Sequence, residues 1–421
     1  MPGDLLQGRL RGAFHFRAGA GVLHDHSGLL VGRKLIKLGH TQGFLTLADY
    51  LGDRFESNGL RTFQALLMII FMIPMMGAQT IGAGVILRVY TGAPEWVGIV
   101  GMGIVVILYC MSGGIRGAML TDVIQGGLML ATAIVTFVVS VRLGGGFEAI
   151  STKLLELNPA YMSHPGVGRA YGWANYVSMI VLWSFFSISQ PTLVTKFFAM
   201  KDYKVMFKAT ILGTLGMWIA ATLIEWSGVN GIVSIPGLQG KDIDFIVPLL
   251  LQKSLSPVIS SLLITGIMAA GMSTIDSLLI SATGAITRDI YQRRVNPQAT
   301  DGQILRLSRY VTVIIGVIAI CFGVSRPATI FKLILFAFGG LGIWTALVLL
   351  GLYWKGATRA GAFAGVAVGE ALFVLMTLKR PGWAFGFNPL IVCWAYAMIV
   401  MTVVSLVTRR ASDKTLKRHF A

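Results

Sequence analysis

Residues 269–282 read AAGMSTIDSLLISA, a polar stretch inside a long apolar run of the sequence. Its small and hydroxyl residues recur every three or four positions, as Ala270, Ser273, Thr274, Ser277 and Ser281. On an α-helix this spacing places them on one face. A hydroxyl beside a main-chain carbonyl one turn earlier supplies oxygens of the kind that bind hard cations. The stretch therefore predicts a membrane helix with a candidate cation site.

A purely structural use of the same hydroxyls remains open. Ser and Thr in membrane helices often bond to a carbonyl one turn earlier or hold two helices together. Spacing alone does not separate this interpretation from a cation site. Asp276 lies roughly 100–200° around the helix from Ser273 and Thr274, so it need not belong to the same site.

The composition of the whole chain is that of a membrane protein. The 421 residues are 55% hydrophobic and 13% charged, with a mean hydropathy of +0.74, whereas a soluble domain is about 25% charged. At roughly 20 apolar residues per span, about ten helices are expected, at residues 62–88, 95–112, 118–142, 172–194, 206–230, 255–285, 305–324, 328–353, 360–378 and 388–408. We therefore expect an all-α polytopic protein embedded in a lipid bilayer.

The net charge of +17 does not indicate a nucleic-acid partner, because Lys and Arg form no patch interleaved with aromatic residues. Most of them lie in alternate loops between the apolar runs and in the C-terminal tail. The positive-inside rule places these loops and the C-terminus in the cytoplasm. We expect a multi-pass protein of the inner or plasma membrane, with a transmembrane domain at residues 36–410 and a basic cytoplasmic tail at residues 411–421.

The first 35 residues differ from the rest of the chain. They are rich in Gly, His and Arg, and they lack both a spanning run and the apolar segment of a signal peptide. His24 and His26 flank Asp25, but further ligands at metal-binding spacing are missing. We expect residues 1–35 to be an atypical, poorly ordered N-terminal segment.

Ionisable residues are rare in membrane helices and mark pathways or partners. The predicted spans contain Asp122, Glu225, Asp276 and Glu370, with Lys332 near the start of one. Asp122 follows Thr121 and precedes Gln125 by about one turn, and this clustering favours a functional role. Glu225 and Glu370 are isolated, so facing a protein interior would explain them equally well.

The span at residues 172–194 carries a proline with polar neighbours. Ser187 and Gln190 precede Pro191, and Trp183 lies two turns before it. Proline removes a backbone donor and breaks or kinks a helix, and transporters build substrate sites from such breaks. An ordinary kink packed by aromatic residues explains the same pattern, so both interpretations stay open.

Several motifs of other protein classes are missing from the sequence. It has neither a GxxxxGK[ST] phosphate loop nor an HExxH motif, and none of its six His lies in a predicted span. An ATP-driven pump and a membrane enzyme are therefore disfavoured, and we predict no catalytic residue, no cofactor and no resident metal beyond a coupling ion. A filter-like loop or rings of charge, which would indicate a channel, are also missing.

Three segments in order carry a resemblance to a known family. Residues 269–291 resemble the signature helix of the sodium:solute symporter family, which includes bacterial proline and pantothenate symporters and animal sodium/glucose cotransporters. GGIRGAMLTDVIQG, at residues 113–126, resembles the family's Gly-Gly-x(5–7)-Thr-Asp-x-x-Gln segment. SQPTLVTKFFAMKD, at residues 189–202, resembles its Gln-Pro-x(4)-[Arg/Lys]-Phe segment. The similarity runs from about Leu30 to Arg410.

The resemblance implies a LeuT-type core of two five-helix inverted repeats that works by alternating access. It implies a sodium site made by the Ala270 carbonyl and the Ser273 and Thr274 hydroxyls. It further implies a substrate pathway and an ion release pathway. The substrate pathway comprises Trp183, Ser187, Gln190 and Pro191, and the release pathway contains Asp122.

The chain departs from the family pattern at its N-terminus. Family members carry roughly three spans before the one expected at residues 62–88, and the first 30 residues resemble none of them. The first repeat is therefore expected to be incomplete. The leading hypothesis is a sodium-coupled symporter of a small organic solute such as pantothenate, proline or another carboxylate. The alternative is a non-transporting membrane sensor or a defective transporter remnant.

Overall fold

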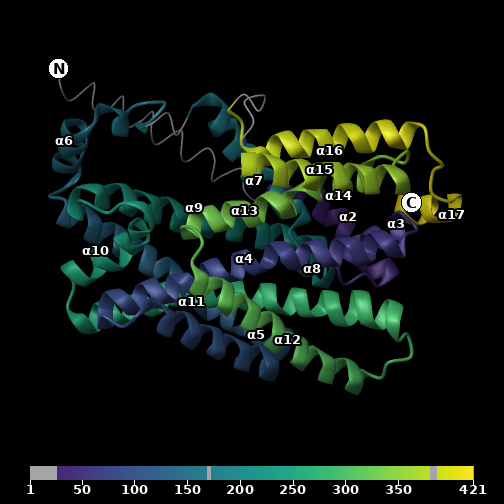
Figure 1. Cartoon of the computed structure of the whole chain (residues 1–421), viewed down its shortest axis with the longest axis horizontal. Helices are drawn as coiled ribbons and strands as arrows, with labels where there is room; N and C mark the ends of the chain where they lie inside the picture. The colour runs from purple at the N-terminus through teal and green to yellow at the C-terminus, as the bar shows by residue number, and fades with distance from the viewer. Residues whose placement is uncertain (1–25, 168–171, 380–385, 421) are drawn as a thin grey trace.

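The computed structural model describes residues 26–167, 172–379 and 386–420, and gives only the backbone for residues 26–29 and 114–120. Every regular element in these residues is helical (Figure 1). In chain order the elements are α2 (His26–Gln42), α3 (Leu47–Arg54), α4 (Asn58–Thr91), α5 (Glu95–Leu143), α6 (Phe147–Leu157), η2 (Pro159–Met162), α7 (Trp173–Ser189), α8 (Pro191–Ala199), α9 (Tyr203–Ser234), η4 (Gly240–Phe245), α10 (Ile246–Ser254), α11 (Pro257–Gly284), η5 (Ala285–Val295), α12 (Asp301–Ser325), α13 (Ile330–Ile343), α14 (Thr345–Tyr353), α15 (Arg359–Lys379), α16 (Pro389–Leu406) and α17 (Asp413–Phe420).

The membrane-spanning helices agree with the sequence prediction. Nine segments of the described residues are long and apolar enough to cross a membrane, or up to ten if α7 and α8 form one broken span. The predicted all-α polytopic fold is confirmed. One difference concerns α5, which is continuous from Glu95 to Leu143 although it contains two predicted spans. No proline lies between these two spans, so the backbone can continue its helical hydrogen bonds through the glycines near Gly113.

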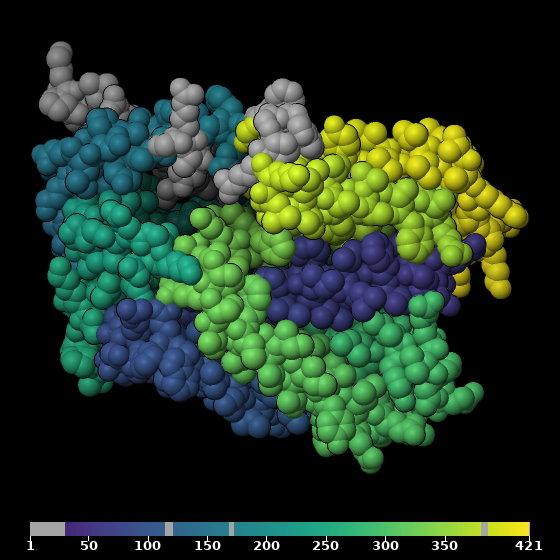
Figure 2. Space-filling model, in the orientation of Figure 1, coloured from purple at the N-terminus to yellow at the C-terminus, as the bar shows by residue number. Residues whose placement is uncertain are grey.

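Helix α4 lies at the centre of the bundle. It packs against α5, α11, α12 and α13, and in Figure 1 it runs between the α15–α16 pair and the α5, α11 and α12 helices. Figure 2 shows the same arrangement as a space-filling surface, with the N-terminal purple helices enclosed between the yellow and green ones. Central burial explains why the α4 sequence is apolar on nearly all sides rather than on one stripe.

Two glycines allow α4 and α5 to approach closely near the turn that joins them. A Cβ added at Gly84 would lie 2.6 Å from the Glu95 carbonyl oxygen. One added at Gly98 would lie 2.6 Å from the Ala83 carbonyl oxygen. Both positions therefore require glycine at this helix–helix contact.

One span is sharply broken in the part of the chain that the structure describes. Helix α7 ends at Ser189 and α8 begins at Pro191, and their axes differ by 50°. Pro191 is the first residue of α8, where its missing N–H leaves no intrahelical bond unmade. The span predicted at residues 328–353 is confirmed as one candidate span, Ile330–Tyr353, in which α13 and α14 are separated only at Trp344, whose backbone dihedrals are helical.

The two ends of the described chain pack together. Residues 26–35, which we had assigned to the N-terminal segment, belong to α2, where Val31 and Leu35 are fully buried; residues 1–25 lie outside the described residues. The tail after residue 410 contains α17, which contacts α3 beside the marked C-terminus in Figure 1. The α17 residues Arg418 and His419 lie 2.9 and 2.7 Å from the Asp53 carboxylate.

A second acid on this face binds the start of the tail. The hydroxyls of Ser412 and Thr415 donate to the Glu56 carboxylate, and these two bonds hold the pKa of Glu56 below its usual value. Together with the contacts to Asp53, they join the tail to the chain segment that precedes α4.

Arg54, at the end of α3, is fully buried and joins this region to α14. Its guanidinium donates to the carbonyl oxygens of Gly351 and Trp354, each at 2.9 Å, and to that of Ala357 at 3.4 Å. Burial lowers the pKa of Arg54. A cation at the C-terminal end of a helix also interacts favourably with the helix dipole, so Arg54 stabilises the end of α14.

We expect Arg54→Met to lower the free energy of unfolding by about 2–4 kcal/mol, because it leaves buried carbonyls without a donor. Thermal unfolding of the detergent-solubilised protein would measure this as a clearly lower Tm. Arg88→Met is the matched control, because Arg88 is 56% exposed and pairs with Glu95 near the surface. Equal Tm values for the two variants would contradict the role of Arg54.

Candidate functional site

The three predicted sodium ligands converge on α11. The hydroxyls of Ser273 and Thr274 both donate to the carbonyl oxygen of Ala270, each at 3.1 Å. Three oxygens therefore gather at one point of the helix. A hydroxyl that joins two helices would bond to the second helix. Among the described residues, neither of these hydroxyls does so. Back-bonding to the same helix remains compatible with this geometry.

The helices beside this point approach closely. Gly271 faces α4 and α5, because a Cβ added there would lie 2.8 Å from the Met102 side chain and 3.5 Å from the Gln79 carbonyl oxygen. Small residues at such a contact let a second helix come near enough to contribute further oxygens.

Asp276 belongs to a different contact of α11. The Tyr109 hydroxyl, from α5, lies 3.1 Å from Oδ2 of Asp276 and 3.2 Å from the Met272 carbonyl oxygen. Asp276 is fully buried, and its Oδ1 has no hydrogen-bond partner among the described residues. The sequence left the role of Asp276 open, and the structure places it at the α5–α11 contact.

The predicted substrate residues gather around the break between α7 and α8. Ser187, Ser189 and Gln190 are all at least 96% buried there. Trp183, two turns earlier, packs edge-on against Phe186 of α7 and Phe338 of α13, with ring centroids 5.7 and 5.5 Å apart. The buried hydroxyls and amide thus lie next to an aromatic surface, as in sites for small organic molecules.

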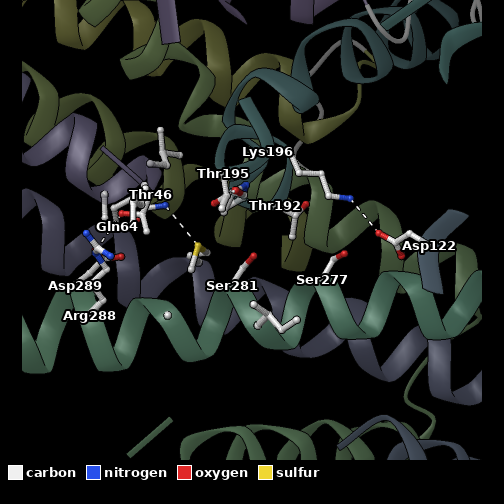
Figure 3. Close-up of a pocket in the computed structure, with 17 residues that line it drawn as sticks. Thr46, Gln64, Asp122, Thr192, Thr195, Lys196, Ser277, Ser281, Arg288 and Asp289 are labelled. Atoms are coloured by element: carbon white, nitrogen blue, oxygen red, sulfur yellow. Dashed lines mark hydrogen bonds and ion pairs between the residues drawn. The ribbon is translucent and has the colours of Figure 1, made fainter. Parts of the chain in front are cut away.

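A cavity of about 200 Å³ lies between α8 and α11. Its polar lining comes from several elements and comprises Thr46, Gln64, Asp122, Thr192, Thr195, Lys196, Ser277, Ser281, Arg288 and Asp289. In Figure 3, Ser277 and Ser281 point from α11 toward the α8 residues Thr192 and Thr195. Pro191 also lines this cavity, whereas Trp183, Ser187, Gln190 and the three predicted sodium ligands do not.

An ion pair closes one end of the cavity. Lys196 Nζ, from α8, lies 3.5 Å from Oδ2 of Asp122, from α5 (Figure 3). The other oxygen, Oδ1, is buried without a hydrogen-bond partner among the described residues. A carboxylate with one unused oxygen beside several hydroxyls attracts small cations. The geometry of the cavity is thus compatible with a cation passing Asp122.

A polar network closes the other end. Thr46, from the loop before α3, donates to Oδ1 of Asp289 at 3.0 Å. Asp49, in α3, lies 3.9 Å from Arg288 and 3.5 Å from Arg293, both of η5. Sequence reasoning missed this network, because its partners are distant in the chain. The basic and acidic residues that follow the signature stretch were the available signal.

The remaining ionisable residues of the spans lie outside the cavity. Glu370 is 7% exposed on α15 and packs near the Trp344 indole. Glu225 lies on α9, and Lys332 lies on an exposed face at the start of α13. Within the described residues no group of three or more His, Cys, Asp or Glu could hold a metal ion, and His24 and Asp25 fall outside that part of the chain.

The fold is a multi-pass helical bundle with a broken span and an internal polar cavity. These features are typical of membrane transport proteins. Residues 12–369 match the family model of the sodium:solute symporter family. The chain therefore belongs to the sodium:solute symporter family, which confirms the resemblance and the prediction of a sodium-coupled solute transporter.

Individual relatives agree with this membership. The chain is 26% identical over 390 residues to the sodium/pantothenate symporter of Haemophilus influenzae. This alignment covers 91% of this chain and 79% of the relative. It is 27% identical to the osmoregulated proline transporter OpuE of Bacillus subtilis, over 89% of this chain and 76% of the relative.

A solved structure shows the same fold. The chain superimposes with a TM-score of 0.78 on a Na⁺-coupled sialic acid symporter in a substrate-bound outward-open state. The match covers 94% of this chain and 87% of that structure, at 21% sequence identity. A sensor or a remnant without transport is not favoured by these similarities.

Proposed function

We propose that this protein couples the inward movement of sodium to the transport of a small organic carboxylate by alternating access. Membership of the sodium:solute symporter family supports sodium coupling and the transport of a solute. The convergence of three oxygens on α11 supports the location of the ion site, at the Ala270 carbonyl and the Ser273 and Thr274 hydroxyls. In this proposal the transport cycle uses sodium as its coupling ion and involves no cofactor and no catalytic reaction.

The solute pathway follows the broken helix. Trp183, Ser187 and Gln190 supply the aromatic face, a hydroxyl and an amide on the α7 side of the break, and Pro191 makes the break itself. Gln190 Oε1 is buried without a hydrogen-bond partner among the described residues. Such a group gains a bond when a polar ligand arrives, so it favours solute binding at this point.

The ion leaves through the cavity that contains Asp122. Ser277 of α11 lies at the end of the cavity that holds the Asp122–Lys196 pair, and Ser281 lies one turn further along α11 toward Asp289 (Figure 3). The excess of Lys and Arg in the loops on the Lys196 side supports a cytoplasmic position of this cavity and of the C-terminus, in a protein of the inner or plasma membrane. The cavity then lies on the inward side of the ion site.

The proposed solute class comes from the relatives. The named relatives transport pantothenate and proline, and the structural neighbour transports sialic acid. All three solutes carry a carboxylate, so we assign a small carboxylate to this chain.

A competition assay tests the assignment. The full chain is reconstituted in vesicles, and uptake of labelled proline and labelled pantothenate is measured with sodium or with potassium outside. We expect at least one solute to enter only with sodium, and its unlabelled form to compete while its analogue without a carboxylate, prolinamide or pantothenol, does not. Equal competition by the carboxylate and by the analogue that lacks it would contradict the solute class.

A further inference from the structure

The end of α7, at the α7–α8 break, is joined to the α13–α14 junction at Trp344 by a pair of buried hydroxyls. Ser189 is the last residue of α7, and Thr345 is the first residue of α14. Their hydroxyl oxygens lie 2.8 Å apart, and the two residues are 1% and 0% exposed. Hydrogen bonds between buried groups in a membrane helix bundle stabilise one arrangement of the helices, because no water replaces them.

Each hydroxyl also reaches a backbone carbonyl of the opposite helix. Ser189 Oγ lies 2.8 Å from the Leu341 carbonyl oxygen, and Thr345 Oγ1 lies 3.0 Å from the Phe185 carbonyl oxygen. A hydroxyl donates only one hydrogen. Three donor orders are therefore possible. Thr345 donates to Ser189 and Ser189 to Leu341, or Ser189 donates to Thr345 and Thr345 to Phe185, or each hydroxyl donates to the carbonyl of the opposite helix. Every order joins α7 to the α13–α14 junction.

Two glycines of α13 allow neighbouring side chains to pack directly against its backbone. A Cβ added at Gly339 or Gly340 would lie 2.3 or 2.2 Å from the rings of Phe373 and Phe71. Glycine here lets neighbouring helices pack against the α13 backbone just before the junction at Trp344. The α13–α14 junction contributes the Leu341 carbonyl and the Thr345 hydroxyl to the contacts with α7.

The same two helices hold the aromatic surface of the proposed solute pathway. Phe338 of α13 stacks on Phe186 with ring centroids 4.3 Å apart, and it packs edge-on against Trp183 at 5.5 Å. Phe338 lies about two turns before Thr345, and Trp183 lies nearly two turns before Ser189. The hydroxyl pair and the aromatic group therefore form one continuous seam between α7 and α13–α14.

We propose that Ser189 and Thr345 are positioning residues for solute binding, which hold α13 in register with α7 and keep Trp183 in place. This inference rests on the proposed solute pathway along α7. It also connects that pathway to the α7–α8 break, because Ser189 lies two residues before Pro191. The hydroxyls act through the packing of Trp183 and need not touch the solute.

Transport kinetics in vesicles test the proposal with Thr345→Val, which removes the hydroxyl and keeps the shape. We expect the solute KM to rise about tenfold at saturating sodium, since a buried hydrogen-bond partner is lost. The sodium concentration for half-maximal uptake should change less than about twofold, because Ser273 and Thr274 are untouched. Thr345→Ser keeps the hydroxyl and should restore the wild-type KM.

Ser184→Ala is the matched control, because Ser184 lies on α7 and, among the described residues, bonds to the Ile180 carbonyl of its own helix, at 2.7 Å, and to no other helix. Ser189→Ala is a second variant for the same kinetic measurement. It replaces Thr345→Val if that variant is not recovered as a monodisperse protein. In the double variant the two effects should not add. A wild-type solute KM in the recovered variant, or equal rises in the solute and sodium constants, would overturn the inference. Sodium-independent uptake by the wild type would instead refute the proposed function.

Discussion

Replacing Ser273 or Thr274 by alanine should raise the sodium concentration for half-maximal uptake by about tenfold or more. Each change removes one oxygen from the group that converges on the Ala270 carbonyl. A hydrogen bond or ligand contact to a charged group is worth about 1.5–3 kcal/mol, and 1.4 kcal/mol corresponds to a factor of ten. The solute KM at saturating sodium should change much less, because saturating sodium restores the ion-bound state.

Initial uptake rates over a range of sodium concentrations measure this effect. Thr265→Val is the matched control, because Thr265 lies on an exposed face of the same helix and bonds to the Leu262 carbonyl. Equal sodium dependence in the wild type, both alanine variants and the control would refute the ligand assignment. The hydroxyls would then only back-bond within α11.

Asp122→Asn should lower the maximal rate of uptake by about tenfold, with little change in the sodium concentration for half-maximal uptake. The carboxylate is the anionic group that a departing sodium ion meets in the cavity beside Ser277, and its loss removes that attraction. Lys196→Gln should have a smaller effect of about threefold, because the pair is partly exposed, at 41% and 25%.

The double variant separates the two residues. If Lys196 acts through Asp122, adding Lys196→Gln to Asp122→Asn should cause no further change. Glu156→Gln, on the exposed surface of α6, is the control for loss of a carboxylate. A wild-type maximal rate in Asp122→Asn would contradict a role of this cavity in ion release.

Local sequence signals predicted the spans and the broken helix well. Apolar runs of about 20 residues mark membrane helices because the bilayer core has a fixed thickness. Pro191 marks the α7–α8 break because proline cannot donate a backbone hydrogen bond. The spacing of Ala270, Ser273 and Thr274 correctly placed three oxygens together, since that contact is local to one helix turn.

Contacts between distant segments could not be predicted from one sequence. The α13–α14 junction at Trp344 is bonded to α7, about 155 residues away in the chain. The cavity needs α5, α8 and α11 to meet, and its network at Thr46, Asp49 and Asp289 uses the start of α3, which carries no motif. The docking of α17 on α3 depends on a salt bridge between residues at opposite ends of the chain.

The most direct test of sodium coupling is solute accumulation against its own gradient. Vesicles that contain the full wild-type chain receive labelled solute under an inward sodium gradient, an inward potassium gradient, or equal sodium on both sides. Coupled transport predicts that the internal solute transiently exceeds the external concentration with the sodium gradient alone, and that Ser273→Ala with Thr274→Ala abolishes this overshoot. Equal uptake under all three conditions would contradict it.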